Sequence, residues 1–350
     1  MDKTNPTIRV GVIGATGYTG SELLRLLLAH SNVELTRVTS RSETGIPLAD
    51  YWPNLRGYCE LAFSAPEAKD LAEACEVVFF ATPHAVSMNM MAELIELGVK
   101  VIDLSADFRL KDVTQWEHWY GVKHTCPELI ASAVYALPET HREQIRDAQL
   151  LACPGCYPTS VLLGFLPLLE EGLIETDSLI ANSASGVSGA GKQAKVANLF
   201  AEVGDNFKAY GVAGHRHFPE IEQGLNHMAG EAVTLTFVPH LLPMIRGIHS
   251  TLYCKPKDFT QDFQALYEQR FSDEPFIDIL PAGQYPETRS VKGTNLCRIS
   301  VQPIASSTML AILVVEDNLV KGAAGQAVQI MNIVFDWPET TGLSNIALLP

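Results

Sequence analysis

The sequence predicts an α/β protein with two domains, a parallel doubly wound sheet followed by an α+β domain with a mostly antiparallel sheet. Two observations carry this prediction. Early in the chain, short apolar runs such as "IRVGVIGA", "EVVFFAT" and "KVIDLS" alternate with helical patterns. After about residue 155 the apolar runs lie closer together with fewer helices between them, as in "AVTLTFVPHL", "LCRISVQP" and "MLAILVVE".

Length, charge and composition limit the partners. The chain has 350 residues, 47% hydrophobic and 19% charged, which is typical of a globular protein with two domains. Its formal net charge of −15 argues against a nucleic-acid partner, which would require clustered lysine and arginine. Prolines interrupt the longest apolar stretch and the first residues show no signal-peptide pattern, so we expect no membrane partner. The seven scattered cysteines fit reduced thiols, and we expect a cytosolic setting.

The two domains are expected to be discontinuous in sequence. "SELLRLLLAH" places leucines on one helical face and "VELTRVTS" follows as a strand, giving a βαβ unit. "AVSMNMMAELIELG" predicts a helix that ends in Gly98, and "DNLVKGAAGQAVQIMNIVF" predicts a last helix that returns to the first domain. We therefore expect one domain from residues 1–155 plus 318–350 and a second from residues 156–317.

The first loop is rich in glycine. "GVIGATGYTG" lies between a predicted strand and a helix, where glycines let the backbone approach a pyrophosphate. A tight turn without a ligand is the alternative, but the strand–turn–helix context favours a Rossmann-type dinucleotide site. The candidate cofactor-binding residues are Gly14, Thr16, Gly17, Tyr18, Thr19 and Gly20.

The end of the second predicted strand bears on which dinucleotide binds. Sites for NAD usually place Asp or Glu there, to hold the ribose 2′-hydroxyl. This strand ends in "VTSRSETG", where Ser40 and Arg41 suit a 2′-phosphate, although Glu43 follows closely. The sequence therefore favours NADP(H) over NAD(H).

The segment "CPGCYPTS" raises a choice between a metal site, a redox pair and a nucleophile. The other cysteines form no second C-x-x-C, so a structural zinc site is disfavoured, and a thioredoxin-type motif normally opens the helix of a small domain. Pro158 suits the first position of a helix, which would leave Cys156 just before it, where the helix dipole favours a thiolate. We predict that Cys156 is the nucleophile and that Cys153 is a small buried strand residue.

Two histidines are candidates for the base. "GHRHFPEI" contains His215 and His217, which could share one face of a strand and resemble metal ligands. Surface loop histidines are the alternative. A glycine before them and a proline after them favour a functional loop, and we predict no bound metal.

Further candidates lie in two other motifs. "DLSADFR" ends a predicted strand with Ser105, Asp107 and Arg109. Arg109 could hold a substrate carboxylate or simply pair with Asp107. "SASGVSGAGK" could bring backbone N–H groups and Lys192 against a phosphate or a nicotinamide, but it lacks the residue order of a P-loop.

In this order the motifs resemble those of the N-acetyl-γ-glutamyl-phosphate reductases of arginine biosynthesis. The matching segments run from residue 11 to about residue 330, and the most specific are "PGCYPT" and "GHRH-PEI". The family is similar in fold to aspartate-semialdehyde dehydrogenase. A related reductase acting on aspartyl phosphate or on a carrier-linked acyl phosphate, and a non-catalytic NADP-binding regulator, are the alternatives.

The resemblance implies a particular chemistry. Cys156 would attack the γ-acyl phosphate of a small-molecule substrate to form a thioester, and NADPH would reduce the thioester to a semialdehyde. A histidine of the "GHRH" loop would transfer protons; we prefer His217, with His215 as a substrate or phosphate contact. Arg109, Lys192 and Ser105 are candidates for substrate binding. The family pattern adds Ser188, Gly189, Ala190 and Asn318 to the cofactor site and implies a homo-oligomer, either a dimer or a tetramer.

Overall fold

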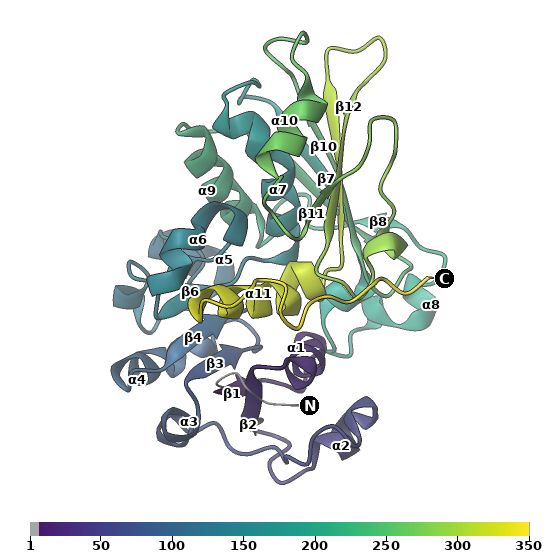
Figure 1. Ribbon diagram of the computed structural model, residues 1–350. Coiled ribbons are helices and arrows are strands. Elements are labelled where there is room, and N and C mark those ends of the chain that lie inside the picture. The colour runs from purple at the N-terminus through teal and green to yellow at the C-terminus, as the bar shows by residue number, and fades with distance from the viewer. Residues whose placement is uncertain (1–6, 350) are drawn as a thin grey trace. The chain divides into compact units, whose positions relative to one another are not determined.

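The computed structural model describes residues 7–349, so the predicted domain limits at residues 1 and 350 lie outside the described residues. The chain divides into two compact units, which are described separately below (Figure 1). Unit 1 comprises Met1–Pro154 and Ala323–Ser344, and unit 2 comprises Gly155–Gly322 and Asn345–Pro350. These limits differ slightly from the predicted ones: the return to unit 1 falls after residue 322 instead of 317, and residues 345–349 group with unit 2.

Unit 1 is built on a parallel sheet of the predicted kind. Its strand order is β2-β1-β3-β4-β6-β5, and each described pair of neighbours is parallel. The strands are β1 (Ile8–Ile13), β2 (Val33–Thr39), β3 (Val77–Phe80), β4 (Lys100–Asp103), β5 (Val134–Tyr135) and β6 (Leu150–Ala152). All four residues of β3 are buried, as expected for a continuous apolar run at the centre of a parallel sheet.

Helices connect and cover these strands. They are α1 (Tyr18–Ala29), α2 (Leu48–Tyr51), α3 (Ala68–Ala74), α4 (Met91–Glu96), α5 (Val113–Tyr120), α6 (Pro138–Asp147) and α11 (Gly325–Val334), with short 3₁₀ turns η1 (Pro53–Leu55), η2 (Ser87–Asn89) and η3 (Pro127–Leu129). In α1, Leu23, Leu24 and Leu27 are buried as the pattern predicts. The last helix, α11, packs on α1, α6 and β4 and so belongs to unit 1.

The prediction of a single helix over "AVSMNMMAELIELG" was wrong for the first half of this segment. The segment forms η2 and then the short α4. The physical reason is Ser87, whose hydroxyl is 2.7 Å from a carboxylate oxygen of Asp103 and 2.9 Å from one of Asp107. These side-chain hydrogen bonds compete with a regular helical turn.

Unit 2 has a mixed, mostly antiparallel sheet, which confirms the predicted fold class. Its strand order is β11-β12-β13-β10-β7-β9-β8; β11 with β12 and β7 with β9 are parallel, and the other neighbours are antiparallel. The strands are β7 (Leu179–Gly186), β8 (Lys208–Ala209), β9 (Leu235–Leu242), β10 (Ile248–Cys254), β11 (Ile277–Ile279), β12 (Cys297–Pro303) and β13 (Leu310–Glu316).

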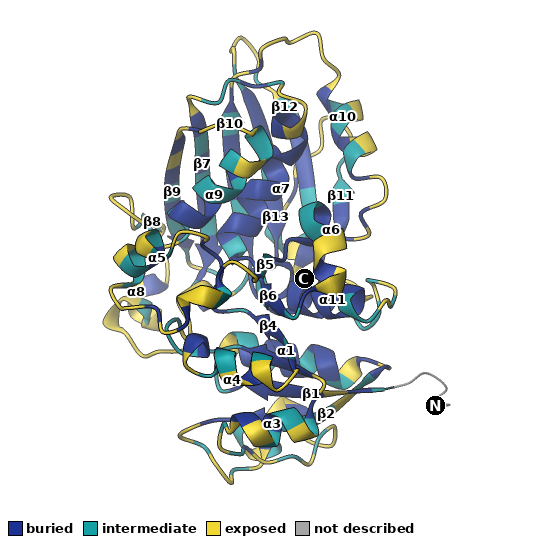
Figure 2. Cartoon of the chain, turned by 90° about the vertical axis from the view of Figure 1, so that its left-hand side faces the viewer, coloured by how far each residue is buried: buried dark blue, intermediate teal, exposed yellow. Residues whose placement is uncertain are grey.

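The longer helices of unit 2 lie on one face of this sheet (Figure 1). The helices are α7 (Cys156–Glu170), α8 (Phe200–Val203), α9 (Phe218–Ala229) and α10 (Phe263–Arg270), with 3₁₀ turns η4 (Val187–Ala190), η5 (Val196–Asn198) and η6 (Thr288–Val291) and a π-helical turn η7 (Val320–Ala324). The central helix α7 packs on β10 and β13 and is flanked by α9 and α10. Figure 2 shows it dark blue, because its residues from Tyr157 to Leu169 are buried. We find no helix among residues 7–349 that is long and apolar enough to cross a membrane.

Candidate functional site

The glycine loop of unit 1 leads from β1 directly into α1. Gly14 has a φ of +84°, and a Cβ there would lie 2.7 Å from the carbonyl oxygen of Ala81, so both backbone and space require glycine. Gly17 is the N-cap of α1, no side chain caps the helix there, and nothing lies within 4 Å of a Cβ built on it. The space beside the N-cap of α1 is therefore open, as an anion-binding helix terminus requires.

A pocket of about 310 Å³ adjoins this loop. Its walls come from the ends of β1, β2 and β3 and from the segment after β3. The lining residues are Ile13, Gly14, Thr16, Thr39, Ser40, Arg41, Ser42, Pro66, Phe80, Thr82, Pro83, Val86, Asn89 and Met90. Ser40 is buried, and its hydroxyl accepts a hydrogen bond from the backbone N–H of Glu43 (3.3 Å), whereas Arg41 is exposed. This lining offers hydroxyls and a cation but no carboxylate.

In unit 2 the reactive thiol predicted from the sequence lies at the start of α7. The helix begins at Cys156 itself, with Gly155 as N-cap, so the prediction that Pro158 opens the helix was wrong by two residues. Proline fits here because the first-turn N–H groups have no intrahelical acceptor. Cys156 is partly exposed, whereas the next thirteen residues, from Tyr157 to Leu169, are buried, and the thiol sits at the positive end of the helix dipole.

Two residues from distant segments enclose this helix start. A carboxylate oxygen of Glu220, in the first turn of α9, accepts a hydrogen bond from the N–H of Gly155 at 2.8 Å. Gly322, in the π-helical turn η7, lies so close that a Cβ there would be 2.7 Å from the Cβ of Cys156 and 2.9 Å from Oε1 of Glu316. The backbone around Cys156 is therefore held from both sides.

The predicted histidine loop precedes α9 and is a turn, not a strand. His217 is the N-cap residue of α9, and its backbone N–H donates to Nδ1 of His215 at 3.1 Å. The two imidazole rings are 5.1 Å apart, and both contact the ring of Tyr157, at 5.7 Å and 5.8 Å. Tyr157 is the residue after Cys156, so the histidines lie near the start of α7, as the functional-loop interpretation requires.

Burial changes the protonation equilibrium of His215. Burial, assisted by the nearby positive charge of Arg216, lowers the pKa of His215 to about 4. Because Nδ1 of His215 accepts a hydrogen bond, its single proton at neutral pH resides on Nε2. His215 is thus a neutral hydrogen-bond donor at physiological pH and cannot serve as a base through Nδ1.

Aromatic rings surround His215. Tyr210 and Phe237 lie 5.5 Å and 5.6 Å from its ring. The hydroxyls of Tyr157 and Tyr210 are 3.0 Å apart, and that of Tyr157 also donates to the carbonyl of His240 at 3.1 Å. Burial raises the pKa of Tyr210 to about 12, so this hydroxyl stays protonated.

Asn318 holds the segment "SASGVSGAGK", residues 183–192, in place. The Asn318 side chain accepts a hydrogen bond from the N–H of Gly247 at 2.8 Å, and its amide donates to the hydroxyl of Ser188 at 3.0 Å. Next to it, Asp317 forms an ion pair of 3.0 Å with Arg246. Asn318 is thus buried, and both the oxygen and the nitrogen of its side-chain amide are hydrogen-bonded. Gly189 and Ala190, which follow Ser188, are exposed.

The predicted substrate contacts lie in different surroundings. Arg109 is buried and one of its N–H groups donates to the carbonyl of Leu104 at 2.7 Å, whereas Lys192 is exposed after Gly191. Ser105 is buried, and its hydroxyl is 2.9 Å from a carboxylate oxygen of Asp103. This hydroxyl is therefore hydrogen-bonded within unit 1.

The cysteines form no disulfide with one another, and within residues 7–349 no cluster of three metal-ligating side chains occurs. Only Cys59 and Cys156 are partly exposed; the buried thiols are Cys75, Cys126, Cys153, Cys254 and Cys297. Burial raises the pKa of Cys126 and of Cys254 to about 12. Cys153 is fully buried, as predicted, but it follows β6 and is not part of that strand.

Sequence reasoning missed Tyr157, Gly322 and Glu316 as neighbours of the site. Tyr157 follows the nucleophile directly and could have been considered, but no local pattern links residues 316 and 322 to residue 156. Their proximity arises only when β13 and η7 fold against α7.

Family models match both units. Residues 9–148 match the semialdehyde dehydrogenase NAD binding domain, and residues 156–318 match the semialdehyde dehydrogenase dimerisation domain.

Solved structures share the fold. Aspartate semialdehyde dehydrogenase II from Vibrio cholerae, complexed with ASA, has a TM-score of 0.73 and 16% identity over 95% of this chain and 99% of its own. Aspartate semialdehyde dehydrogenase with NADP from Candida albicans has a TM-score of 0.71 and 16% identity over 94% and 98%. Fold and domain matches together define the class, a nucleotide-binding oxidoreductase of the semialdehyde dehydrogenase type.

Curated relatives define the family within this class. Two of the most similar, from Saccharophagus degradans and Thiobacillus denitrificans, are 62% and 60% identical to this chain, each over 98% of it and 100% of the relative. Both are named N-acetyl-gamma-glutamyl-phosphate reductase. The chain belongs to the N-acetyl-γ-glutamyl-phosphate reductase family, which confirms the resemblance drawn from its motifs.

Proposed function

We propose that this protein reduces N-acetyl-γ-glutamyl phosphate to N-acetylglutamate semialdehyde with release of phosphate. The reaction uses NADPH, proceeds through a thioester on Cys156 and serves arginine biosynthesis in the cytoplasm. The names of relatives with up to 62% identity support the substrate. The observation that carries the mechanism is the position of Cys156 as first residue of α7, partly exposed, beside a histidine turn.

Cys156 acts as the nucleophile. The positive end of the α7 dipole favours its thiolate over the neutral thiol. The thiolate sulfur attacks the acyl carbon, the bond from that carbon to the phosphate oxygen breaks, and phosphate leaves with the electron pair. Since an acyl phosphate already carries a good leaving group, the protein's task in this step is orientation and charge stabilisation.

The histidines divide the proton chemistry. His215 is neutral with its proton on Nε2, which suits a hydrogen-bond donor to the acyl oxygen or the phosphate. His217 is the acid–base group that protonates the oxygen of the thiohemiacetal and removes that proton again when the thiolate departs. Tyr157 contacts both rings and fixes their orientation.

The residues of unit 1 fit a nicotinamide dinucleotide, which supplies a hydride when bound. The N–H groups at the start of α1, with Gly14, Thr16, Tyr18, Thr19 and Gly20, hold the pyrophosphate, since Gly17 leaves that terminus open. Ser40 and Arg41 bind the 2′-phosphate and so favour NADPH. The solved neighbour from Candida albicans is titled as a complex with NADP.

Three further groups complete the proposed site. Arg109 and Lys192 bind the anionic groups of the substrate. Ser188, Gly189 and Ala190 contact the nicotinamide end of the cofactor, and Asn318 acts through them by fixing Ser188.

The reverse reaction tests this proposal, because the acyl phosphate is labile. Purified protein is mixed with N-acetylglutamate semialdehyde, phosphate and NADP⁺, and NADPH formation is followed by absorbance with and without prior alkylation. We expect phosphate-dependent NADPH formation that alkylation abolishes. Activity with aspartate semialdehyde in place of the acetylated substrate would contradict the proposal.

The choice of cofactor has its own test. Arg41→Glu should weaken NADPH binding at least tenfold while changing NADH binding little, because it removes a cation that only the 2′-phosphate meets. Arg146→Glu, an exposed arginine of α6 outside the pocket lining, is the control. Equal losses for both nucleotides would remove Arg41 from the 2′-phosphate site.

We also propose that the protein is a homo-oligomer assembled through the open face of the unit 2 sheet. In β7, β9 and β10 alternate residues are buried against the helices, and those on the other face are partly exposed. None of the latter is Asp, Glu, Lys or Arg; they are Ile180, Asn182, Ala184, Thr236, Val238, His240, Leu242, His249, Thr251 and Tyr253. A protein interface is depleted of charge in this way, and the matched family model is described as a dimerisation domain.

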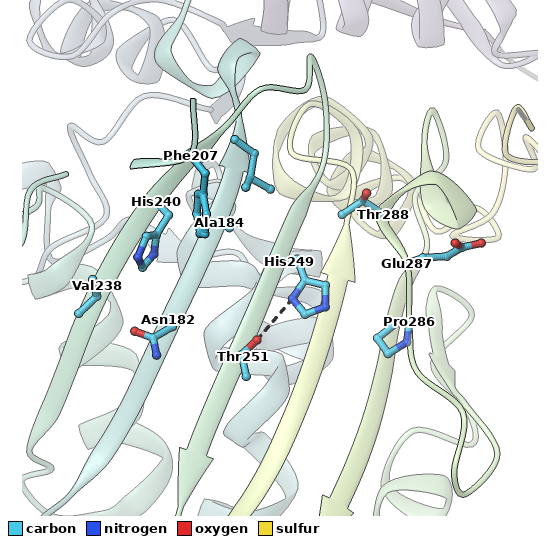
Figure 3. A pocket seen from close by; sticks show the side chains of 11 residues that line it. Asn182, Ala184, Phe207, Val238, His240, His249, Thr251, Pro286, Glu287 and Thr288 are labelled. Atoms are coloured by element: carbon cyan, nitrogen blue, oxygen red, sulfur yellow. Dashed lines mark hydrogen bonds between the residues drawn. The ribbon is translucent and has the colours of Figure 1, made fainter. Parts of the chain in front are cut away.

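The same face carries a shallow hollow of about 620 Å³, shown in Figure 3. Asn182, His240 and His249 project into it from neighbouring strands, and Phe207 lies 5.1 Å from the ring of His240. Burial lowers the pKa of His249. Glu287 also lines the hollow, and its carboxylate is 3.0 Å from the guanidinium of Arg289. A second copy of this chain is the occupant that fits a sheet face on which β7, β9 and β10 present no Asp, Glu, Lys or Arg.

Measurement of solution mass tests the interface. Ala184→Lys places a charge at the centre of this face and should shift the protein to monomers in sedimentation or light scattering. Ala232→Lys, at an exposed alanine before β9, should leave the mass unchanged. An unchanged oligomer in Ala184→Lys, or a wild-type monomer, would contradict the assembly proposal.

A further inference from the structure

Two carboxyl groups that the proposed reaction does not use are buried together at the carboxyl end of β4. Asp103 and Asp107 have no exposed surface, and Ser87 and Ser105 lie between them with at most 1% exposed. An isolated buried carboxylate is costly, so such a pair must be stabilised by protons or hydrogen bonds.

The cluster holds more short oxygen–oxygen contacts than its two serine protons can fill. The hydroxyl oxygen of Ser87 is 2.7 Å from Oδ2 of Asp103, 2.9 Å from Oδ2 of Asp107 and 3.0 Å from the hydroxyl of Ser105. The hydroxyl of Ser105 is also 2.9 Å from Oδ2 of Asp103. Two serine protons cannot fill four oxygen–oxygen contacts, and a proton on a carboxyl group supplies a third.

The two carboxyl groups differ in their backbone donors. Asp107 accepts the N–H groups of Ala85 (2.7 Å) and Met88 (3.3 Å), and Asp103 accepts that of Ser105 (2.8 Å). Burial and the charge of Asp107 raise the pKa of Asp103 to about 7, so the extra proton resides on Asp103 near neutral pH.

The segment that Asp107 holds is a wall of the dinucleotide pocket. Pro83, Val86, Asn89 and Met90 line that pocket. Between them Ala85 has a φ of +62°, a left-handed conformation that alanine adopts at a cost. The bond from its N–H to Asp107 and the Ser87 hydroxyl contacts hold this strained turn in place.

We propose that Asp103, Asp107 and Ser87 are positioning residues for the cofactor pocket, and that the proton on Asp103 keeps its wall in the binding conformation. The proposal rests on the proposed dinucleotide function. When Asp103 loses this proton, two adjacent buried carboxylates repel each other, the contacts of Ser87 are no longer all satisfied, and residues 85–90 loosen. Because the folded pKa of Asp103 lies above its unfolded value of 3.8, this stabilisation of the wall is complete below pH 3.8 and is lost as pH rises through the folded pKa of about 7.

Other ionisable groups surround the pair. The ring of His84 accepts from the N–H of Ala106, and Arg109 donates to the carbonyl of Leu104. On the other side, the ring of His124 lies 2.8 Å from the carbonyl oxygen of Asp107, and the Cys126 thiol donates to the carbonyl of Met88. With a pKa of about 12 the thiol stays neutral, and replacing Asp103 by Asn separates the charge of Asp103 from that of the two histidines.

Two readouts test the proposal in wild type, Asp103→Asn and the control Asp112→Asn between pH 6 and 9. Asp112 caps α5 in the same unit but lies outside the cluster. The first readout is the Kd of NADH, which lacks a titrating 2′-phosphate, measured by fluorescence. The second is hydrogen exchange of residues 83–90, corrected for the intrinsic pH dependence of amide exchange. Far-UV circular dichroism verifies that each variant folds.

In wild type and Asp112→Asn we expect the Kd to rise about tenfold from pH 6 to 9 and protection of residues 83–90 to fall. Asp103→Asn carries a permanently neutral amide and should show neither change. The same pH trend in wild type and Asp103→Asn in both readouts would overturn the proposal. If no nucleotide binds but protection still responds to pH only when Asp103 is present, the positioning role stands and the proposed function fails.

Discussion

Helices α1 and α7, one in each unit, begin at candidate functional residues, and the surroundings of their N-termini differ. Helix α1 begins after Gly17 and α7 after Gly155, and neither N-cap glycine offers a side chain to satisfy the first N–H groups. At α1 a Cβ on Gly17 would meet nothing within 4 Å. At α7 the Glu220 carboxylate takes the N–H of Gly155, and Gly322 presses against Cys156.

The difference shows how one physical device serves two purposes. An open terminus leaves several N–H groups for a ligand anion, so the protein binds through its backbone. An enclosed terminus leaves room for a single side chain, so its dipole acts on the Cys156 thiol. Cofactor binding should therefore depend on free space at α1, and reactivity on the fixed geometry at α7.

The largest effect is expected at the enclosed terminus. Cys156→Ser should lower turnover by more than about 10³-fold while leaving the Kd of NADPH unchanged, because the hydroxyl is a far weaker nucleophile than the thiolate. Steady-state rates and fluorescence titration measure the two quantities. Cys153→Ser is the control and should remain active. A complete loss of rate in that control would indicate a redox pair in place of a single nucleophile.

A smaller but still large loss of turnover is expected when a larger residue replaces Gly322 beside Cys156. Gly322→Ala places a methyl group 2.7 Å from the Cβ of Cys156, so the start of α7 must shift. We expect about 10²-fold lower turnover, since small misplacements of a reacting group cost that much. The NADPH Kd should not change. Wild-type turnover in a folded Gly322→Ala protein would mean that the thiol does not need this fixed position.

At the open terminus the expected effect is on binding alone. Gly17→Ala should weaken NADPH binding about tenfold, because the methyl group enters the space that a pyrophosphate would occupy. The melting temperature should stay close to that of wild type, since the methyl group meets no protein atom. Gly14→Ala, at a positive φ and against Ala81, should lose both binding and stability. An unchanged Kd in Gly17→Ala would place the pyrophosphate elsewhere.

The smallest expected effect is a loss of folding stability at acidic pH, caused by His215 near the start of α7. The folded pKa of His215, about 4, lies below its unfolded value of 6.5, so its neutral form stabilises the fold above pH 6.5 and this contribution is lost as pH falls toward 4. Urea midpoints between pH 4 and 7 measure the loss, and His215→Gln should reduce the slope. A slope that remains the same in His215→Gln would assign the acid sensitivity to other groups.

Features whose cause is local were predictable from the sequence. The strands and α1 follow from apolar periodicity, and the glycine loop and the helix after "CPGCYPTS" follow from residues adjacent in the chain. The start of α7 at Cys156 instead of Pro158 is an error of two residues. Such boundaries depend on partners such as Glu220, which is 65 residues away.

Features whose cause is distant were not predictable. The turn at Ser87 replaces a helix because two carboxyl groups, 16 and 20 residues further on, fold onto its hydroxyl. Neither the proximity of Gly322 to Cys156 nor the lowered pKa of His215 has a signature in the local sequence. Each arises from burial and tertiary contacts.

The burial of the other thiols has a practical consequence for chemical labelling. Of seven cysteines, five are shielded, and only Cys59 shares partial exposure with Cys156. A mild electrophile at neutral pH should therefore add one mass equivalent to Cys156 first, and a Cys59→Ser variant would take up a single label. In such a variant a fluorophore or a covalent inhibitor could be attached to Cys156 alone. The number of labels per protein molecule would then measure the fraction of molecules with a reactive Cys156.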